Sequence, residues 1–214
     1  GAMRPDSLAT RWLDRLNAAL MRRAARSISL GRCMTARVAA KGVDAASLEL
    51  ITPWADSAEI TPVAPAENPV RAEWGLSDRF VVMYSGNFGL GHDLASPCEA
   101  ALALAGRDDI AFVFIGGGKR RGEVEEFARA HPEARIQIHP HQPRERLAAS
   151  LSAADVHLVT LDEAALGVMV PSKLFGIMAA ARPALFLGPA ESEVGRIIEE
   201  TGCGQRLVPG DAPG

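Results

Sequence analysis

The spacing of apolar residues predicts a chain of alternating strands and helices. Continuous apolar runs such as Phe80–Tyr84 are typical of strands buried on both faces of a parallel sheet. The expected strands after residue 79 are 80–84, 110–115, 135–138, 155–160, 184–187 and 205–208. Helices are expected over 93–105, 119–130, 143–152, after Ser172, and over 192–201. This alternation predicts an α/β fold, a Rossmann-like parallel sheet with helices on both faces.

Four further elements are expected before this sheet: a helix over 7–26, a strand at 27–30, a helix over 32–41 and a strand at 48–51. The stretch from Thr52 to Gly75 has no periodicity and contains Pro53, Pro62, Pro65 and Pro69, which is typical of a linker. We therefore divide the chain into N-terminal elements (4–55), a linker (56–78) and a Rossmann-like domain (79–214).

Composition narrows the function classes. The apolar fraction of 48% is enough for a sizeable core, and the net charge of −3 argues against a dedicated nucleic-acid-binding protein. No apolar run approaches the roughly 20 residues that cross a bilayer. Cys33, Cys98 and Cys203 are odd in number and lack metal-ligand spacing. With no signal-peptide pattern, they favour reduced thiols and a cytoplasmic location.

Positive charge is concentrated at the N-terminus. The cations there are Arg4, Arg11, Arg15, Arg22, Arg23, Arg26, Arg32, Arg37 and Lys41. Among them, Leu8, Trp12, Leu16 and Leu20 recur at a spacing that fits one helical face. A basic amphipathic helix can lie on the anionic inner face of a membrane or against a partner. It can equally be an ordinary helix packed on the fold, with its arginines in solvent.

The stretch from Gly167 to Pro183 carries the most chemical information. It predicts a loop that enters a short apolar helix at Pro171 and Ser172. A helix N-terminus attracts phosphate, and Lys173 adds a full positive charge beside it. A core helix with an incidental lysine remains the alternative.

Loops that follow four predicted strands should meet at the carboxyl edge of the sheet, where ligands bind in such folds. These loops are Ser85–Asp93, Gly116–Arg120, His139–Pro143 and Leu161–Glu163. Their glycines allow close approach of a ligand to the backbone, and their charged groups suit a phosphorylated sugar or a nucleotide.

Other motif classes fit less well. The first loop has the order Gly-x-x-Gly-x-Gly, which differs from the dinucleotide-binding Gly-x-Gly-x-x-Gly. A P-loop and a Gly-x-Ser-x-Gly elbow are both absent from the sequence. The histidines at 92, 139, 141 and 157 have no zinc-site spacing.

Several segments, in their order, resemble the C-terminal, donor-binding half of GT-B glycosyltransferases of family 4. They are Met83–Gly89, Phe112–Gly118, Ala153–Val159 and the block from Val170 to Pro183. Ile51–Asp56 resembles the segment that connects the two domains of those enzymes. The Pro-Ser-Lys version resembles bacterial transferases that build O-antigen and capsule chains.

The resemblance implies transfer of a hexosyl or N-acetylhexosaminyl group, with retention, from a nucleotide-diphosphate sugar to a glycan or lipid-linked acceptor. The implied donor is a UDP-sugar, and neither a cofactor nor a metal is expected. Lys173 and Glu163 are the implied catalytic residues. The implied donor-binding residues are Ser85, Gly86, Asn87, Gly89, His92, Gly117, Lys119, His141, Gln142, Asp162, Pro171 and Ser172.

The sequence departs from the family pattern in three respects. The two glutamates of the family's Glu-x7-Glu signature fall at Val168 and Gly176. The usual phosphate-gripping Arg and Lys near the first loop are replaced by Asn87 and His92. Residues 4–55 are too few for a whole acceptor domain, so we expect a fragment that is inactive alone, or one half of a two-chain enzyme. A nucleotide-sugar 2-epimerase and a non-catalytic binding module remain alternatives.

Overall fold

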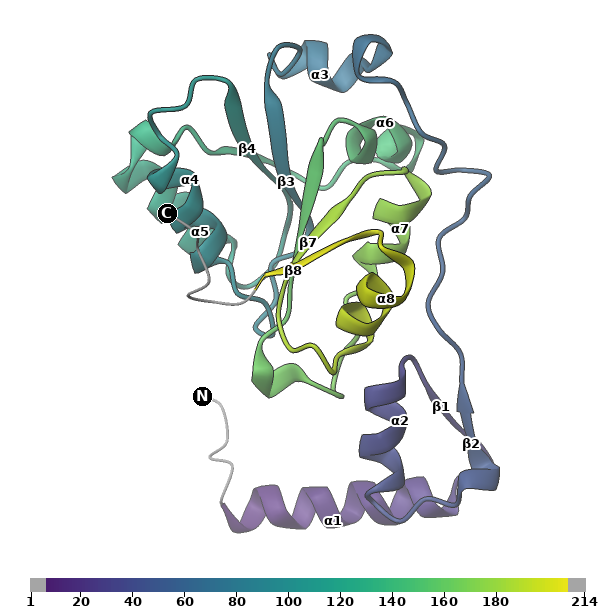
Figure 1. Cartoon of the computed structure of the whole chain (residues 1–214). Helices are drawn as coiled ribbons and strands as arrows, with labels where there is room; N and C mark the ends of the chain where they lie inside the picture. Colours follow the sequence, from purple (N-terminus) through teal and green to yellow (C-terminus); the bar gives the residue numbers. More distant parts are fainter. Residues whose placement is uncertain (1–6, 208–214) are drawn as a thin grey trace.

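The computed structural model describes residues 7–207, and its centre is a six-stranded parallel sheet (Figure 1). The strands are β3 (Phe80–Asn87), β4 (Ile110–Gly117), β5 (Gln137–His139), β6 (Val156–Thr160), β7 (Ala184–Leu187) and β8 (Gly204–Leu207). Their order is β5-β4-β3-β6-β7-β8, so the direction of winding reverses between β3 and β6. The predicted Rossmann-like α/β sheet is confirmed.

Helices cover both faces of this sheet, because alternate residues of the strands are apolar on both sides. Helices α4 (Ala95–Ala103) and α5 (Arg121–Ala130) cover one face, where Tyr84, Phe88 and Phe114 form the aromatic part of the core. The other face is covered by α3 (Pro69–Glu73), α6 (Leu147–Ser152), α7 (Lys173–Ala179) and α8 (Glu193–Thr201) (Figure 1). Within residues 7–207, no helix combines the length and apolarity needed to cross a membrane.

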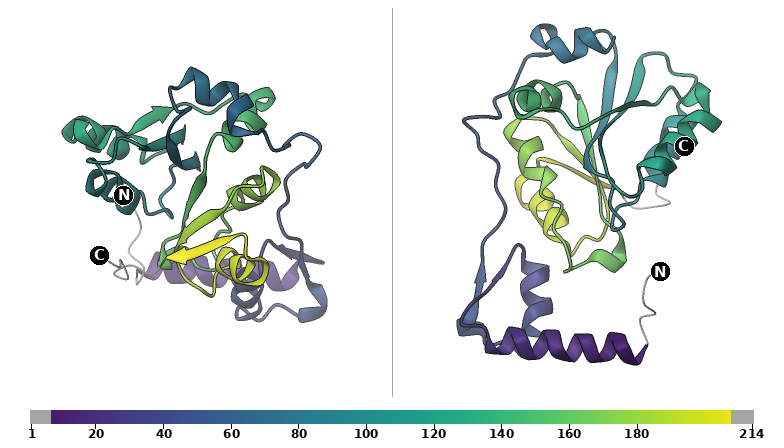
Figure 2. Two further views of the ribbon diagram at one scale, coloured as in Figure 1. Left: turned by 45° about the horizontal axis from the view of Figure 1, so that its top comes forward. Right: turned by 180° about the vertical axis from the view of Figure 1, so that it is seen from behind.

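The N-terminal elements form a separate small unit. It contains α1 (Leu8–Arg23), β1 (Ser27–Ser29), α2 (Arg32–Ala39) and β2 (Leu48–Leu50), and the two strands pair in parallel. The strands of the large sheet run from the end that carries α3 toward this unit (Figures 1 and 2). Arg32 joins the two parts: its backbone N–H donates to the Glu193 carboxylate over 2.5 Å, and its guanidinium pairs with Glu193 and Glu200.

The segment predicted as an irregular linker contains two short helices. A 3-10 helix covers Pro65–Glu67, and α3 follows at Pro69–Glu73. Asn68 caps α3 by accepting hydrogen bonds from the backbone N–H groups of Val70 and Arg71. Helix α3 has only five residues, which is too few to show a helical period in the sequence. Residues 1–6 and 208–214, with the predicted boundaries at 4, 208 and 214, lie outside the described residues.

The observed boundaries of other elements differ from the predicted ones by a few residues. The predicted helix 143–152 consists of a 3-10 turn (Arg144–Arg146) followed by α6. Strands β3 and β4 continue past their predicted ends, because Ser85, Gly86 and Asn87 pair in register with residues 115–117. The predicted loop after residue 84 is therefore partly strand. This extension carries candidate ligand-binding residues on a rigid element.

A buried arginine fixes α3 to the sheet. Arg71 is only 4% exposed, and it donates to the Ala153 carbonyl and to the Asp155 carboxylate, both over 3.0 Å. It also donates to the Arg79 carbonyl. Asp155 in turn accepts the backbone N–H of Val81 over 2.7 Å. This network joins the amino-terminal ends of β3 and β6 and leaves no charge of the pair uncompensated.

We expect Arg71→Ala to lower the free energy of unfolding by about 3 kcal/mol, because it leaves Asp155 without its charged partner in a largely buried position. Urea denaturation followed by circular dichroism measures the change. Arg107→Ala is the matched control, since the Arg107–Asp109 pair is exposed and such pairs contribute at most about 1 kcal/mol. Equal losses in the two variants would show that the buried network has no special role.

Candidate functional site

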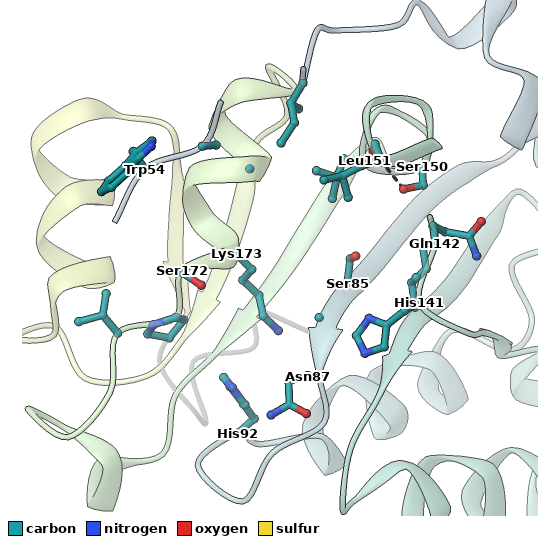
Figure 3. A pocket seen from close by; sticks show the side chains of 18 of the residues that line it. Trp54, Ser85, Asn87, His92, His141, Gln142, Ser150, Leu151, Ser172 and Lys173 are labelled. Atoms are coloured by element: carbon teal, nitrogen blue, oxygen red, sulfur yellow. Dashed lines mark hydrogen bonds between the residues drawn. The ribbon is translucent and has the colours of Figure 1, made fainter. Parts of the chain in front are cut away.

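A cavity opens where β3 and β6 separate. Strand β3 pairs with β4 along its whole length, but it pairs with β6 only at Val82 and Met83. Beyond these residues the two strands diverge, at the place where the strand order reverses. Open α/β sheets bind ligands at such points. The cavity here measures about 470 Å³ (Figure 3).

Most of the predicted site residues line this one cavity. The predicted donor-binding residues there are Ser85, Gly86, Asn87, His92, His141, Gln142, Pro171 and Ser172, and the predicted catalytic Lys173 lies with them. Figure 3 shows Asn87, His92 and Lys173 gathered at one end and His141 facing them from the neighbouring loop. The sequence therefore placed these side chains at one sheet edge correctly, although their roles stay predictions.

Two glycines allow β3 and β4 to pair closely beside the cavity. Gly86 and Gly116 are register partners, and both have positive φ, 144° and 134°. A Cβ atom on Gly116 would collide with the Gly86 carbonyl oxygen. A Cβ atom on Gly86 would lie 3.0 Å from Cε and 3.2 Å from Nζ of Lys173. Glycine at 86 thus leaves room for the lysine.

Lys173 is the most unusual residue in the cavity. Its Nζ is buried, has no hydrogen-bond partner, and lies 3.3 Å from the centroid of the Tyr84 ring. Among the described residues, no carboxylate forms an ion pair with it. Burial lowers the pKa of this amine well below its ordinary value, because desolvation disfavours the charged form. A ligand with negative charge would reverse that effect.

His92 is held in one tautomer. Its Nδ1 lies 2.7 Å from the Thr160 carbonyl oxygen, and a carbonyl only accepts, so Nδ1 carries the proton. Burial is the main cause that lowers the pKa of His92, with the Lys173 charge second. The neutral ring then presents Nε2 as an acceptor. In Figure 3 the ring lies beside Asn87 at the floor of the cavity.

The opposite wall is apolar and was not predicted from the sequence. Leu147 and Leu151 of α6, together with Trp54 and Ile60 from the connection after β2, complete it. Trp54 is 79% exposed at the rim. A tryptophan in a segment rich in proline is the sequence signal that could have indicated this wall.

Gly176 also lines the cavity, at a position where the family signature would place a glutamate. A Cβ atom there would lie 3.4 Å from Cδ1 of Leu151 and 3.8 Å from Cδ1 of Ile60. These are ordinary van der Waals distances, so a side chain at this position would begin beside apolar groups of α6 and of the connecting segment.

The remaining predicted site residues lie elsewhere. Asp162 and Glu163 line a second cavity of about 450 Å³, together with Asp93, Glu191 and Arg206. Lys119 is exposed in the turn before α5. Gly89 and Gly117 do not line the first cavity, although their backbones pack beside Asn87 and His141. Glu163 is thus separated from the cavity that contains Lys173.

The predicted cap of α7 is only partly correct. Ser172 does occupy the N-cap position, but its backbone is already helical and its side chain makes no capping hydrogen bond. The helix is seven residues long, so its dipole is small, and a full positive charge at this point requires the protonated form of Lys173. Within residues 7–207, no group of three His, Cys, Asp or Glu side chains is placed to hold a metal ion.

Sequence comparison relates the chain to glycosyltransferases, although no protein-family model matches it. It is 34% identical over 213 residues to the probable glycosyltransferase WbjE of Pseudomonas aeruginosa, covering 99% of this chain and 52% of that protein. It is 30% identical over 174 residues to WcaI of Escherichia coli (strain K12), which is named for a glycosyl transferase role in colanic acid biosynthesis. That match covers 80% of this chain and 42% of WcaI. The chain spans about half the length of these curated relatives.

Solved structures share the fold at low sequence identity. HepE of Anabaena in complex with UDP-glucose has a TM-score of 0.76 and 16% identity, covering 94% of this chain and 55% of HepE. WaaG, a glycosyltransferase involved in lipopolysaccharide biosynthesis, has a TM-score of 0.72 and 15% identity, covering 97% of this chain and 56% of WaaG. The predicted resemblance to GT-B glycosyltransferases of polysaccharide biosynthesis is confirmed.

We expect Lys173→Met to stabilise the ligand-free protein near pH 7 by about 1–3 kcal/mol, because it removes a buried, unpartnered amine. Since the folded-state pKa of Lys173 is lowered, the unfolded chain holds a proton that the folded chain lacks. The stability of the wild-type protein should therefore rise with pH across that window, and the gap to the variant should narrow toward about pH 10.

Urea denaturation of both proteins at several pH values measures this gap. Arg129→Met is the matched control, because Arg129 is an exposed cation of α5. A Lys173→Met variant that is less stable than the wild type at pH 7 would contradict the description of Lys173 as an unsatisfied group.

Proposed function

We propose that this chain, a homologue of bacterial glycosyltransferases, binds a nucleotide-diphosphate sugar in the cavity between β3 and β6. The observation that carries this proposal is Lys173, whose Nζ is buried in that cavity with no partner. A buried amine without a counter-charge is costly in the empty protein, and a diphosphate would supply the counter-charge. The cavity volume of about 470 Å³ is in the range of small-ligand sites.

The surrounding residues suggest how the donor would be oriented. Lys173 and Ser172 would bind the diphosphate, with the backbone of Gly86 close by. Asn87 and His92 would contact the sugar, and the loop with His141 would lie along the edge of the base. HepE, which has the same fold, was crystallised with UDP-glucose, so we propose a UDP-sugar as the donor.

For the whole protein we propose transfer of a hexosyl or N-acetylhexosaminyl group, with retention and without a metal ion, to a glycan or lipid-linked acceptor. Negative charge develops on the leaving diphosphate as its bond to the sugar breaks, and the Lys173 ammonium would stabilise it. Glu163 has no part in this proposal, because it lines the other cavity. The described residues contain one Rossmann-like sheet, so we expect them to bind a donor without transferring it.

The first test is calorimetric titration with UDP, GDP and UDP-glucose. We expect one nucleotide to bind, and Lys173→Ala to weaken it at least about tenfold, because a charge-assisted contact contributes about 1.5–3 kcal/mol. Arg129→Ala removes an exposed positive charge of α5 and should leave the affinity unchanged.

The outcomes separate the alternatives. Binding that is insensitive to Lys173→Ala would place the diphosphate elsewhere. Conversion of a UDP-sugar to its epimer without an acceptor would favour the epimerase alternative. Binding without any transfer, even in a protein extended to the full length of the relatives, would favour a non-catalytic module.

A second proposal concerns helix α1, which we propose lies on an anionic membrane surface, the inner face of the cytoplasmic membrane. No residue of α1 is buried, and Leu8, Trp12 and Leu20 are 84%, 63% and 61% exposed. Arginines flank this apolar stripe, and the acidic Asp14 is paired with Lys41. An exposed apolar face beside unpaired cations is the pattern of an interfacial helix.

Flotation with vesicles tests this second proposal. We expect the protein to float with vesicles that contain anionic lipid at moderate salt, and Trp12→Ala with Leu16→Ala to abolish flotation by removing buried apolar area. Leu90→Ala removes a leucine of another segment that is 70% exposed, and it should have no effect. If the wild-type protein floats with neither anionic nor neutral vesicles, the membrane proposal is wrong and the apolar stripe of α1 is a protein-contact surface instead.

A further inference from the structure

The side-chain nitrogen of Lys173 lies in surroundings that favour the neutral amine over the ammonium form. Its Nζ lies over the Tyr84 ring at 3.3 Å from the centroid, and Gly86 closes the space on another side. A ring face attracts a cation, but this attraction is smaller than the cost of removing an ammonium group from water. Neither a hydrogen bond nor an ion pair makes up the difference, as Nζ has no partner.

The groups around Lys173 do not supply negative charge either. Tyr84 faces it from β3, His92 from the following loop and His157 from β6, and His141 lies across the cavity on the loop after β5. Burial raises the pKa of Tyr84 and lowers the pKa of His92, and it lowers the pKa of His157 to about 4. All three are therefore neutral near pH 8. The charged groups that act on these neighbours are Arg120, Arg182 and Asp162.

We propose that Lys173 takes up one proton when a nucleoside diphosphate enters the cavity, so that its positive charge appears only in the complex. This inference rests on the proposed donor site. The amine binds a proton from solvent and becomes an ammonium group, which then pairs with the diphosphate oxygens. The uptake needs no co-reactant besides water or buffer.

Proton uptake has a direction that can be worked out from the two states. In the empty protein, desolvation favours the neutral amine, while in the complex the diphosphate favours the ammonium form. Between the pKa of the free state and that of the complex, binding takes up about one proton. Affinity should therefore fall as pH rises through that window, by up to about tenfold per pH unit.

The arrangement would also make the cavity selective for highly charged ligands. A ligand must offset the cost of charging a buried amine before it gains any affinity. A diphosphate carries more negative charge toward Nζ than a monophosphate or a carboxylate does. UDP should thus be favoured over UMP by more than the count of hydrogen bonds would suggest.

The test is calorimetric titration with UDP at about pH 8, repeated in buffers that differ in their heat of ionisation. The dependence of the measured heat on the buffer gives the number of protons taken up. At this pH the terminal phosphate of UDP, with a pKa of about 6, is already ionised, and both His92 and His157 are neutral. We expect Lys173 to take up about one proton per UDP bound, and a Lys173 variant tests whether another group of the cavity takes it up instead.

Lys173→Arg is the matched control, because a guanidinium stays charged at every accessible pH. This variant should bind UDP with proton uptake near zero and with an affinity that is flat between about pH 7.5 and 9. Lys173→Met should bind more weakly, also without uptake. Thermal melting of both variants shows whether they are folded.

The possible results separate this inference from the proposed function. UDP binding by the wild-type protein without proton uptake overturns the inference and leaves the donor site in place. Uptake that persists in Lys173→Arg overturns it as well, because another group would then be titrating. If neither UDP nor GDP binds the wild-type protein, the donor site is wrong and this inference fails with it.

Discussion

Strands β3 and β6 are held together at one end and separated at the other, and the candidate site depends on this. At their amino-terminal ends, Asp155 accepts the N–H of Val81 and pairs with the buried Arg71. Only Val82 and Met83 then pair across to β6. After these the strands diverge, and the space between them holds the Lys173 amine over Tyr84. The buried ion pair at one end thus keeps the opening at the other end well defined.

Buried charged groups usually have partners, and the two buried basic side chains of this sheet differ in this respect. Arg71, at the closed end, has a charged partner and carbonyl acceptors, whereas Lys173, at the open end, has none. Both are basic side chains of helices packed on the same face of the sheet. One therefore contributes to stability, and the other, a buried amine without a partner, costs stability in the ligand-free protein. Such a trade between stability and activity is common at functional sites.

The sequence predicted those features that repeat regularly or that lie next to strand ends. Alternating apolar segments predicted the sheet, and the positions of Ser85, His141 and Lys173 after or near strands brought them to one cavity. It could not predict that Glu163 lies in another cavity, because the direction of a side chain after a strand depends on the turn there. It also missed α3 and Trp54, whose positions are set by long-range packing.

The small N-terminal unit is coupled to the loop that carries the site. Arg37 of α2 donates to the Leu166 carbonyl. The backbone of Gly167, with a φ of 70°, packs closely against Cys33, because a Cβ atom added there would lie 3.0 Å from the Cys33 carbonyl oxygen. Arg32 pairs with Glu193 at the start of α8. Two parallel strands alone are too few for a stable sheet, so these contacts hold the unit in place. Trp54, in the segment that leads out of this unit, lines the same cavity as Lys173, so the contacts that hold the unit in place also bring this side chain to the site.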